Sequence, residues 1–421
     1  MAKSTQLTPN QIRGFWAAWG GWALDGMDSF IYALVLAPAL RDLLPASGKP
    51  ASAANLGFYG GLLFAIFLIG WGFAFAWGPV ADRFGRVKTL SFTILCYSLF
   101  TFLGCAAGTV WQLGLFRFLA GIGIGGEWTL GGILVAEEWP EDRRVQGAAW
   151  MHTGYYFGFF VAAGLNYWIG AKYGWRAMFA LGGTPALLVA LVRYGVHEPA
   201  RWKNRVAAAG SPFARIFSPV YRRRTLLNAL FLLIAMIGLW AGSVYVPGAV
   251  SQIAAREGRP AAEAARLASW ATMLLSIGTI LGCLLVPYLA GRFGRRGALG
   301  FFFGLMGVSV AEAFGYAFYL PHGALTAFIA SLFFVGVGGA SFCVFTVWLP
   351  EQYGTDCRAS AFAFATSSGR FVAATITFLV GAGVSRFGTI GIPVAFTAAA
   401  FLAGLILLPW GEETKGKTLP A

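Results

Sequence analysis

The chain has 421 residues, of which 58% are hydrophobic and only 11% are charged. Soluble domains carry roughly 25% charged residues, so this composition excludes a soluble globular protein and indicates an integral membrane protein. The net charge of +14 comes from basic residues that form no groove for a polyanion. We interpret it as contact with anionic membrane lipid, and not as nucleic-acid binding.

Twelve apolar runs follow one another along the chain. Many are about 20 residues or longer, which is the length that a hydrocarbon layer requires of a helix, and they lack the alternation of barrel strands. The runs are centred near residues 26, 67, 96, 123, 158, 184, 238, 278, 308, 335, 372 and 399. The sequence therefore predicts an all-α integral membrane protein with twelve transmembrane helices.

A polar segment after the sixth run divides the runs into two sets of six. We predict an N-terminal six-helix half at residues 1–195, a cytoplasmic linker at 196–224, a C-terminal six-helix half at 225–410 and a cytoplasmic tail at 411–421. Most Lys and Arg lie in the alternate loops on the side of the N-terminus, which predicts that both termini are cytoplasmic. No cleavable signal peptide is evident, so we expect the first helix to anchor a multi-pass protein of the plasma (cell inner) membrane.

The sequence offers no constellation for a metal or for an enzyme. The five cysteines lie in or beside apolar runs without paired spacing, so no disulfide or metal cluster is expected. No nucleophile–base pair appears either. We therefore expect a secondary active transporter and not an enzyme. We expect no cofactor, only a proton as the coupling ion, and we expect the protein to be a monomer.

Two sequence elements recur in the two sets of runs. "ADRFGR" at residues 81–86 returns as "AGRFGR" at 290–295, each between the second and third run of its set. "EEWPEDRRVQG" at 137–147 is echoed by "EQYGTDCRASA" at 351–361, each between the fourth and fifth run. The two halves are therefore predicted to be pseudo-symmetric copies of one unit, an architecture whose substrate site lies near the middle of the bilayer.

The loop "GPVADRFGRVK" at residues 78–88 resembles the signature of the major facilitator superfamily, G-x-x-x-D-R-x-G-R-x-K, at every position. "RFLAGIGIGGE", "HEPARW" and "EETKGKTL" also fall where that superfamily has related motifs, so the resemblance covers essentially the whole chain. It implies the major facilitator fold and transport by alternating access. Gly291 stands in the second half where the first half has Asp82, so any gate that uses this acid is one-sided.

Within that superfamily, "LDGMDSFIY", "GGEW" and "YGWRAMF" most resemble the sialate:proton symporters and their monocarboxylate-transporting relatives. The aromatic acid:proton symporters share the D-G-x-D element and are the nearest rival. The resemblance implies proton-coupled import of a small organic anion such as a monocarboxylate, sialate or other sugar acid, with an aromatic acid as the alternative. An efflux pump for amphipaths and a non-transporting nutrient sensor rank lower.

Two carboxylates, Asp25 and Asp28, lie three residues apart at the centre of the first run and share a helix face with Tyr32. Two acids this close in a low-dielectric cavity cannot comfortably both ionise, so one is expected to hold a proton near neutral pH, as a proton carrier must. Alternatively, one acid only pairs with an arginine and the other caps a break in the helix at Gly26.

Arg370 lies near the middle of the eleventh run, with Thr366 and Ser367 one turn away. A guanidinium cannot lose its charge, so it needs an anionic partner. That partner is either the carboxylate of a substrate, which Arg370 would bind in bidentate geometry, or a fixed acid, Asp25 or Asp28.

Four further ionisable residues lie inside the runs, and one of them, Glu312, is expected to be structural. Arg117 matches the fourth-helix arginine that the superfamily associates with proton transfer, and we expect it to tune a first-helix acid. Glu127 is predicted either to be a second proton site or to bind the loop at 143–144. His152, one turn before Tyr155, could take part in substrate or proton binding, or could be a hydrogen-bonded interior residue. The candidate substrate-binding residues are Arg370, Tyr32, His152, Tyr155, Thr366 and Ser367.

The loop signature also predicts a cytoplasmic gate. The resemblance implies that Asp82 closes the cytoplasmic side by engaging the start of the eleventh helix, where a helix dipole and Arg358 are available. Gly85 allows a tight turn and Gly78 close packing. The candidate gate residues are Gly78, Asp82, Arg83, Gly85, Arg86, Glu141, Arg144 and Arg358. The alternative is that these charges are solvated and serve only topology.

Overall fold

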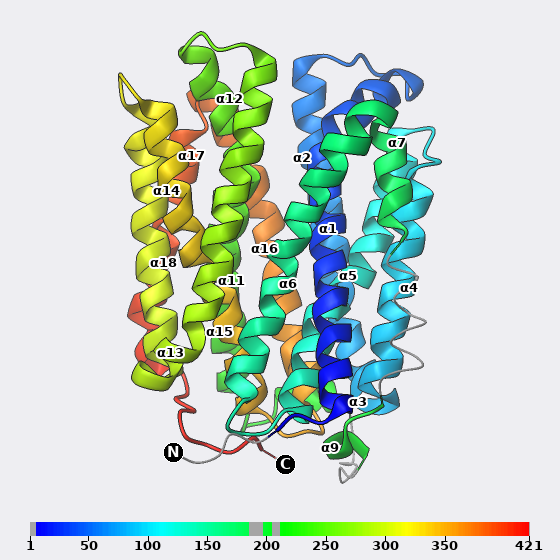
Figure 1. The fold of residues 1–421 in the computed structure, drawn as a ribbon, viewed down its shortest axis with the longest axis vertical. Helices are drawn as coiled ribbons and strands as arrows, with labels where there is room; N and C mark the ends of the chain where they lie inside the picture. Colours follow the sequence, from blue (N-terminus) through cyan, green and yellow to red (C-terminus); the bar gives the residue numbers. More distant parts are fainter. Residues whose placement is uncertain (1–5, 185–196, 204–210, 421) are drawn as a thin grey trace. The chain divides into compact units, whose positions relative to one another are not determined.

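The computed structural model describes residues 6–184, 197–203 and 211–420, and all regular structure in these ranges is helical (Figure 1). The predicted linker and sixth run therefore lie partly outside the described residues. The first helices are α1 (Pro9–Ala46), α2 (Ala53–Phe73), α3 (Trp77–Phe84), α4 (Arg86–Gly104), α5 (Val110–Glu138), α6 (Arg144–Leu165), α7 (Ala171–Gly182), α9 (Ala200–Lys203) and α10 (Pro212–Ile216). The later ones are α11 (Arg222–Val244), α12 (Val246–Arg256), α13 (Ala261–Gly315), α14 (Ala324–Gly339), α15 (Ser341–Trp348), α16 (Arg358–Phe387), α17 (Gly391–Phe396) and α18 (Ala399–Leu407).

The predicted runs fall on these helices in chain order. The eighth and ninth runs share α13, in which Gly294 interrupts the helical backbone with a positive φ of 78°. Seven helices of the described ranges are long and apolar enough to cross a membrane, or up to eight if the bent pair Pro9–Leu36 and Pro38–Ala46 is one span. The chain is therefore an all-α, multi-pass membrane protein.

The chain forms two compact units. The first comprises Met1–Ala229, Thr346–Ala374 and Gly416–Ala421, and the second comprises Leu230–Phe345 and Thr375–Lys415. This grouping does not test the division into halves at residues 196–224, which stays a prediction. All the candidate site residues lie in the first unit.

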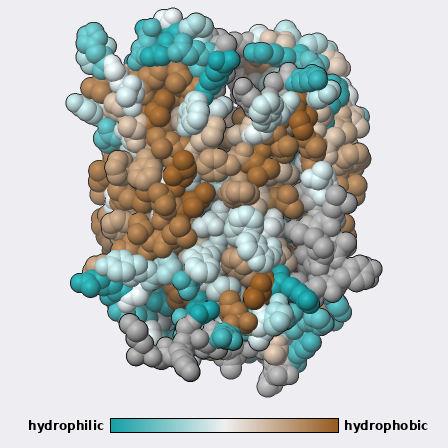
Figure 2. Space-filling model, viewed as in Figure 1, coloured by the Kyte–Doolittle hydropathy of each residue, from teal (hydrophilic) through white to brown (hydrophobic). Residues whose placement is uncertain are grey.

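Helix α4 shows how the first unit meets both lipid and a polar interior. One face exposes Phe92, Leu95, Leu99 and Phe102, while the opposite face buries Thr93, Tyr97, Ser98 and Thr101. The apolar face has the spacing of a helical stripe, so the usual amphipathic pattern is inverted, as expected where the solvent is hydrocarbon. Figure 2 shows apolar side chains across the middle of the visible face and hydrophilic ones at its two ends.

Small residues bring α5 and α6 close to their neighbours in the first unit. A Cβ atom added at Gly154 of α6 would lie 2.6 Å from the carbonyl oxygen of Trp19 on α1. One added at Gly123 of α5 would lie 2.5 Å from the backbone nitrogen of Tyr97 on α4. These close approaches fix the side chains of α1, α4, α5 and α6 against one another.

In the second unit, α13 and α14 pack through glycines in the same way. A Cβ added at Gly338 would lie 2.7 Å from the Cα of Met306, and one at Gly278 would collide with the carbonyl oxygen of Phe333. Small residues at helix contacts are therefore a feature of both units.

Candidate functional site

Asp28 and Arg117 form a fully buried ion pair between α1 and α5. Nη2 of Arg117 lies 3.1 Å from Oδ2 of Asp28, and its Nη1 donates to Oδ1 at 3.4 Å and to the hydroxyl of Thr101 at 3.3 Å. The guanidinium also lies over the rings of Tyr32, at 4.5 Å, and Phe67, at 4.9 Å. Asp28 is therefore the first-helix acid that holds an arginine, and aromatic faces complete the arginine's surroundings.

Asp25 is as deeply buried as Asp28 but has different surroundings. Among the described residues, neither of its carboxylate oxygens has a hydrogen-bond partner. Two acids, Glu127 and Asp28, and two arginines, Arg370 and Arg117, act on it electrostatically. The sequence could not distinguish the two acids, whereas the structure assigns the arginine to Asp28 and leaves the Asp25 carboxyl with no direct partner in the described ranges.

Glu127 on α5 is fully buried, and within the described residues its carboxyl oxygens have no hydrogen-bond partner either. The carboxyl lies against Gly21 of α1, where an added Cβ would collide with Oε2 and lie 3.2 Å from Cδ. In the predicted loop at 143–144, Arg144 instead pairs with Glu141 and, at 3.0 Å, with Glu351. The structure shows no contact between Glu127 and Arg144, and the possible role of Glu127 as a proton site stays a prediction.

Arg370 on α16 is buried, with its guanidinium 3.7 Å from the centre of the Trp71 ring on α2. It interacts electrostatically with Tyr155 and Asp25. One turn away, Thr366 donates to the carbonyl oxygen of Phe362 at 2.9 Å, and Ser367 is also buried. The arginine therefore lies among aromatic rings within electrostatic range of Asp25, on the helix predicted to carry the anion site.

His152 belongs to a buried cluster of rings and one hydroxyl. Its Nδ1 lies 3.2 Å from Oγ1 of Thr346, to which Nε1 of Trp128 donates at 2.8 Å. Beside it, the ring of Trp22 stacks on that of Tyr155 with centroids 4.6 Å apart. The geometry is that of a hydrogen-bonded interior histidine, which was one of the two alternatives, while substrate contact by His152 and Tyr155 stays a prediction.

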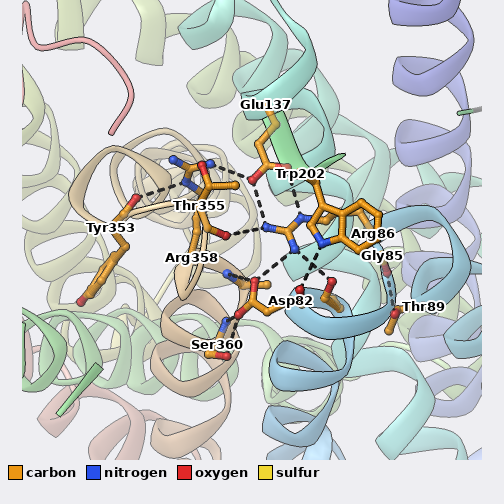
Figure 3. A network of polar contacts seen from close by, with 12 residues as sticks. Asp82, Gly85, Arg86, Thr89, Glu137, Trp202, Tyr353, Thr355, Arg358 and Ser360 are labelled. Atoms are coloured by element: carbon orange, nitrogen blue, oxygen red, sulfur yellow. Dashed lines mark hydrogen bonds and ion pairs between the residues drawn. The ribbon is translucent and has the colours of Figure 1, made fainter. Parts of the chain in front are cut away.

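Asp82, at the end of α3, binds the first turn of α16 (Figure 3). Its Oδ2 accepts hydrogen bonds from the backbone nitrogen of Ser360 at 2.9 Å and from its hydroxyl at 2.7 Å, and Oδ1 accepts one from Ala359 N at 3.3 Å. Gly78 permits this approach, because a Cβ there would lie 2.7 Å from the Cα of Ser360. The start of α16 thus provides the unpaired N–H groups and the positive dipole end that a carboxylate favours.

Glu137, at the end of α5, links the two buried arginines of the loop network (Figure 3). It accepts two hydrogen bonds from Arg86, both at 3.1 Å, and one from Arg358 at 2.7 Å. Arg86 also lies 3.1 Å from Asp82. We call Asp82, Arg86, Glu137 and Arg358 the charge network. Arg358 therefore binds Glu137 and not Asp82, which accepts from the backbone beside it.

Sequence reasoning did not select Glu137, Glu351 or Glu198, although all three lie in the quoted motifs. The available signal was the glutamate with which "EEWPEDRR" and "EQYGTDCR" each begin, because it follows an apolar run and precedes basic residues. Arg83, in contrast, is exposed and lies over the ring of Phe84 at 5.4 Å, whereas the other predicted gate arginine of this loop, Arg86, is fully buried.

Segment Gly416–Pro420 reaches the same network. Arg358 donates to the carbonyl oxygen of Pro420 at 2.6 Å, and the backbone nitrogen of Leu419 donates to Glu141 at 3.4 Å. The Leu419 side chain is buried. Segment Gly416–Pro420 is thus hydrogen-bonded to two predicted gate residues, Arg358 and Glu141.

Each copy of the repeated loop has a glutamate that caps the helix after it. Gly85 has a φ of 118°, and Glu198 accepts from the backbone nitrogens of Arg86 at 2.7 Å and Val87 at 3.1 Å. In the second unit, Glu413 accepts from Arg295 N at 3.0 Å, directly after Gly294. An added Cβ at Gly85 or at Gly294 would collide with the respective glutamate. The glycine of the signature is therefore required both for its backbone conformation and for the approach of this carboxylate.

Glu413 predicts an acid-sensitive contribution to stability. Partial burial raises its pKa, but hydrogen bonds from the backbone nitrogens of Arg295, Lys415, Arg296 and Thr414 outweigh burial, so the pKa lies below its ordinary value. A lowered carboxyl pKa stabilises the fold above the unfolded value of about 4.3, and this stabilisation is lost as the pH falls through the folded value. We expect the thermal midpoint of Glu413→Gln in detergent to fall less than that of the wild-type protein when the pH is lowered below about 5. An equal fall in the two proteins would contradict this.

Comparison with known proteins gives the family. The family model described as Major Facilitator Superfamily matches residues 18–255, more than half of the chain. A probable 4-methylmuconolactone transporter from Cupriavidus pinatubonensis is 27% identical, over 97% of this chain and 92% of the relative. The sialic acid transporter NanX from Escherichia coli K12 is 26% identical, over 70% of this chain and 68% of its own.

Solved structures agree on the fold. The proton:xylose symporter XylE bound to 6-bromo-6-deoxy-D-glucose superposes with a TM-score of 0.78, covering 97% of this chain and 98% of its own, at 19% identity. The expected all-α fold of the major facilitator type is confirmed, and the relatives, which are named transporters, agree with a transporter and not an enzyme. The chain belongs to the Major Facilitator Superfamily.

Proposed function

We propose that this protein is a symporter that imports a small organic anion together with a proton, by alternating access across the plasma membrane, with both termini cytoplasmic. The observation that carries the proposal is the Asp25 carboxyl: it is fully buried, has no hydrogen-bond partner among the described residues and interacts electrostatically with Arg370. Ionisable groups inside a membrane are costly and are functional by default.

Asp25 and Arg370 supply the two charges that the cycle needs. While Asp25 is ionised, it attracts Arg370 and neutralises it at a distance. A proton on Asp25 removes that attraction, and the carboxylate of a substrate then takes its place at Arg370. Because proton and anion together add no net charge, the loaded site is favoured over a site that holds either alone, which is the origin of coupling.

The contacts of Asp82 supply the cytoplasmic gate of this cycle. Its three hydrogen bonds to the start of α16 keep α3 and α16 together in the described state. Opening toward the cytoplasm then requires Asp82 to leave Ser360, while Asp28 and Arg117 remain paired within the first unit. Gly291 offers no acid at the equivalent place in the second half, so the gate is one-sided.

Aromatic acids are a second candidate substrate class. Arg370 lies on the face of Trp71, and Trp22 with Tyr155 forms a stacked pair in the same unit. Such ring faces favour a planar ligand more than a sugar acid. The relatives are named for both kinds of compound, since one is a gallate transporter from Pseudomonas putida and another a sialic acid transporter.

Uptake into proteoliposomes tests the proposal. Radiolabelled benzoate, nicotinate, lactate and N-acetylneuraminate are offered with and without an inward proton gradient. We expect the gradient to accelerate uptake of at least one of them about tenfold or more, equivalent to about 1.4 kcal/mol, and Asp25→Asn to abolish this acceleration. Asp42→Asn is the matched control, because Asp42 is an exposed acid on the same helix. Arg370→Lys should raise KM and keep the proton dependence, since it retains the charge but loses the planar fork.

Acceleration that persists in Asp25→Asn would remove Asp25 from the mechanism. Uptake by the wild-type protein that ignores the gradient for every substrate would remove proton coupling itself. If benzoate and nicotinate are taken up and N-acetylneuraminate is not, the aromatic acid candidate is favoured.

A further inference from the structure

We infer that Glu127 holds a proton throughout the transport cycle, and that the site consequently selects a substrate with a single negative charge. The inference rests on the proposed function and narrows its substrate class to monoanions. It gives a task to Glu127, a fully buried acid that neither the ion pair of Asp28, nor the exchange of a proton at Asp25, nor the charge network uses.

The surroundings of Glu127 contain no cation that contacts it. Within the described ranges its carboxyl makes neither an ion pair nor a hydrogen bond. The ionisable groups on which it acts electrostatically are Asp25 on α1 and Tyr97 on α4, and the hydroxyl of Tyr97 likewise has no hydrogen-bond partner in the described part of the chain. Gly21, which lies against the carboxyl, offers only its backbone.

An ionised carboxylate in these surroundings would be buried without a counter-charge and beside another acid. Burial of such a charge is costly, whereas a neutral carboxyl loses only hydrogen bonds to water and can itself donate one. Asp25 differs, because Arg370 and Arg117 act on it and can support its ionised form. The exchangeable proton therefore belongs to Asp25, and the proton on Glu127 stays where it is.

The charges of the intramembrane residues Asp25, Asp28, Arg117, Glu127 and Arg370 give the charge of the substrate. Asp28 and Arg117 cancel, and a protonated Glu127 adds nothing. In the empty carrier, ionised Asp25 balances Arg370; in the loaded carrier, Asp25 has taken a proton from the outside water and the substrate balances Arg370. Both forms are neutral only if the substrate carries one negative charge. A dianion leaves one uncompensated charge in the membrane interior, because Glu127 has no second proton to accept.

Two measurements test the inference. The first is infrared absorption of the purified full-length protein at neutral pH, compared between wild type and Glu127→Gln. We expect the carbonyl band of a protonated carboxyl to be present in wild type, to persist on alkalinisation, and to be missing in Glu127→Gln. Glu138→Gln, a change of the same chemistry at a partly exposed position, should keep the band. Absence of a Glu127 band at neutral pH overturns the inference whether or not transport is proton-coupled.

The second measurement is charge movement during uptake of a monocarboxylate identified in the proteoliposome assay. We expect uptake by wild type and by Glu127→Gln to be driven by a proton gradient and to be unaffected by a potassium diffusion potential, and the corresponding dicarboxylate to compete at least about tenfold more weakly with both. Uptake driven by the potential in wild type but not in Glu127→Gln would show that Glu127 releases its proton. A dicarboxylate that competes equally well would overturn the selection of monoanions.

Discussion

Glu137→Gln is expected to cause the largest loss of stability of any single substitution in the charge network. Glutamine has nearly the same shape but no charge, so Arg86 and Arg358 would both remain buried without their shared carboxylate. Breaking a buried pair in this way costs about 3–5 kcal/mol. A drop on the order of 10 °C in the thermal midpoint of the purified protein is therefore expected.

The adjacent Glu138→Gln is the matched control for this experiment. Glu138 is only partly buried, and its carboxyl accepts from Asn10 at 3.3 Å, so we expect a change of no more than about 1 kcal/mol. Similar midpoints for Glu137→Gln and Glu138→Gln would show that Arg86 and Arg358 find other partners. Asp82 already lies 3.1 Å from Arg86 and would be the carboxylate that compensates its charge.

Asp28→Asn is expected to destabilise the first unit by about 3–5 kcal/mol, because it leaves Arg117 charged and fully buried. The neighbouring rings of Tyr32 and Phe67 can lessen this cost through their faces but cannot replace a carboxylate. The thermal midpoint and the yield of folded protein in detergent are the measurements.

A double-mutant cycle separates this effect from transport. Asp28→Asn combined with Arg117→Gln removes both charges, so the double variant should be more stable than Asp28→Asn alone and have a coupling energy of about 1–3 kcal/mol. Its proton-driven uptake remains dependent on Asp25 in the proposed cycle. Additive losses in the cycle would contradict a direct pair between the two side chains.

The sequence predicted the fold class because its signals are local and repeated. The length of the apolar runs, the basic loops and the two copies of "RFGR" can be recognised without knowledge of tertiary contacts. The resemblance of the loop signature to its family also implied that Asp82 engages the start of the eleventh helix, which is α16. The structure has Asp82 at Ser360 and Ala359, where free backbone N–H groups bind a carboxylate whatever the side chains are. Such a contact can be anticipated because a helix terminus always presents the same groups.

The partners of the intramembrane charges could not be predicted in the same way. Asp25 and Asp28 lie three residues apart on one helix and have the same chemistry, and only the rotation of α1 against α5 decides which acid meets Arg117. Glu137 was missed because its two arginines lie 51 and 221 residues away in the sequence. Ion pairs over such separations depend on tertiary packing, which no periodicity encodes.

The glutamates that cap the repeated loops set how much of the chain each copy needs to close its own loop. Glu198 lies 112 residues after Arg86, and Glu413 lies 118 residues after Arg295, and each closes over the glycine of its own copy. A chain that ended before its glutamate would leave the backbone N–H groups after the loop glycine without this acceptor. An attempt to express either copy alone should therefore extend as far as its glutamate.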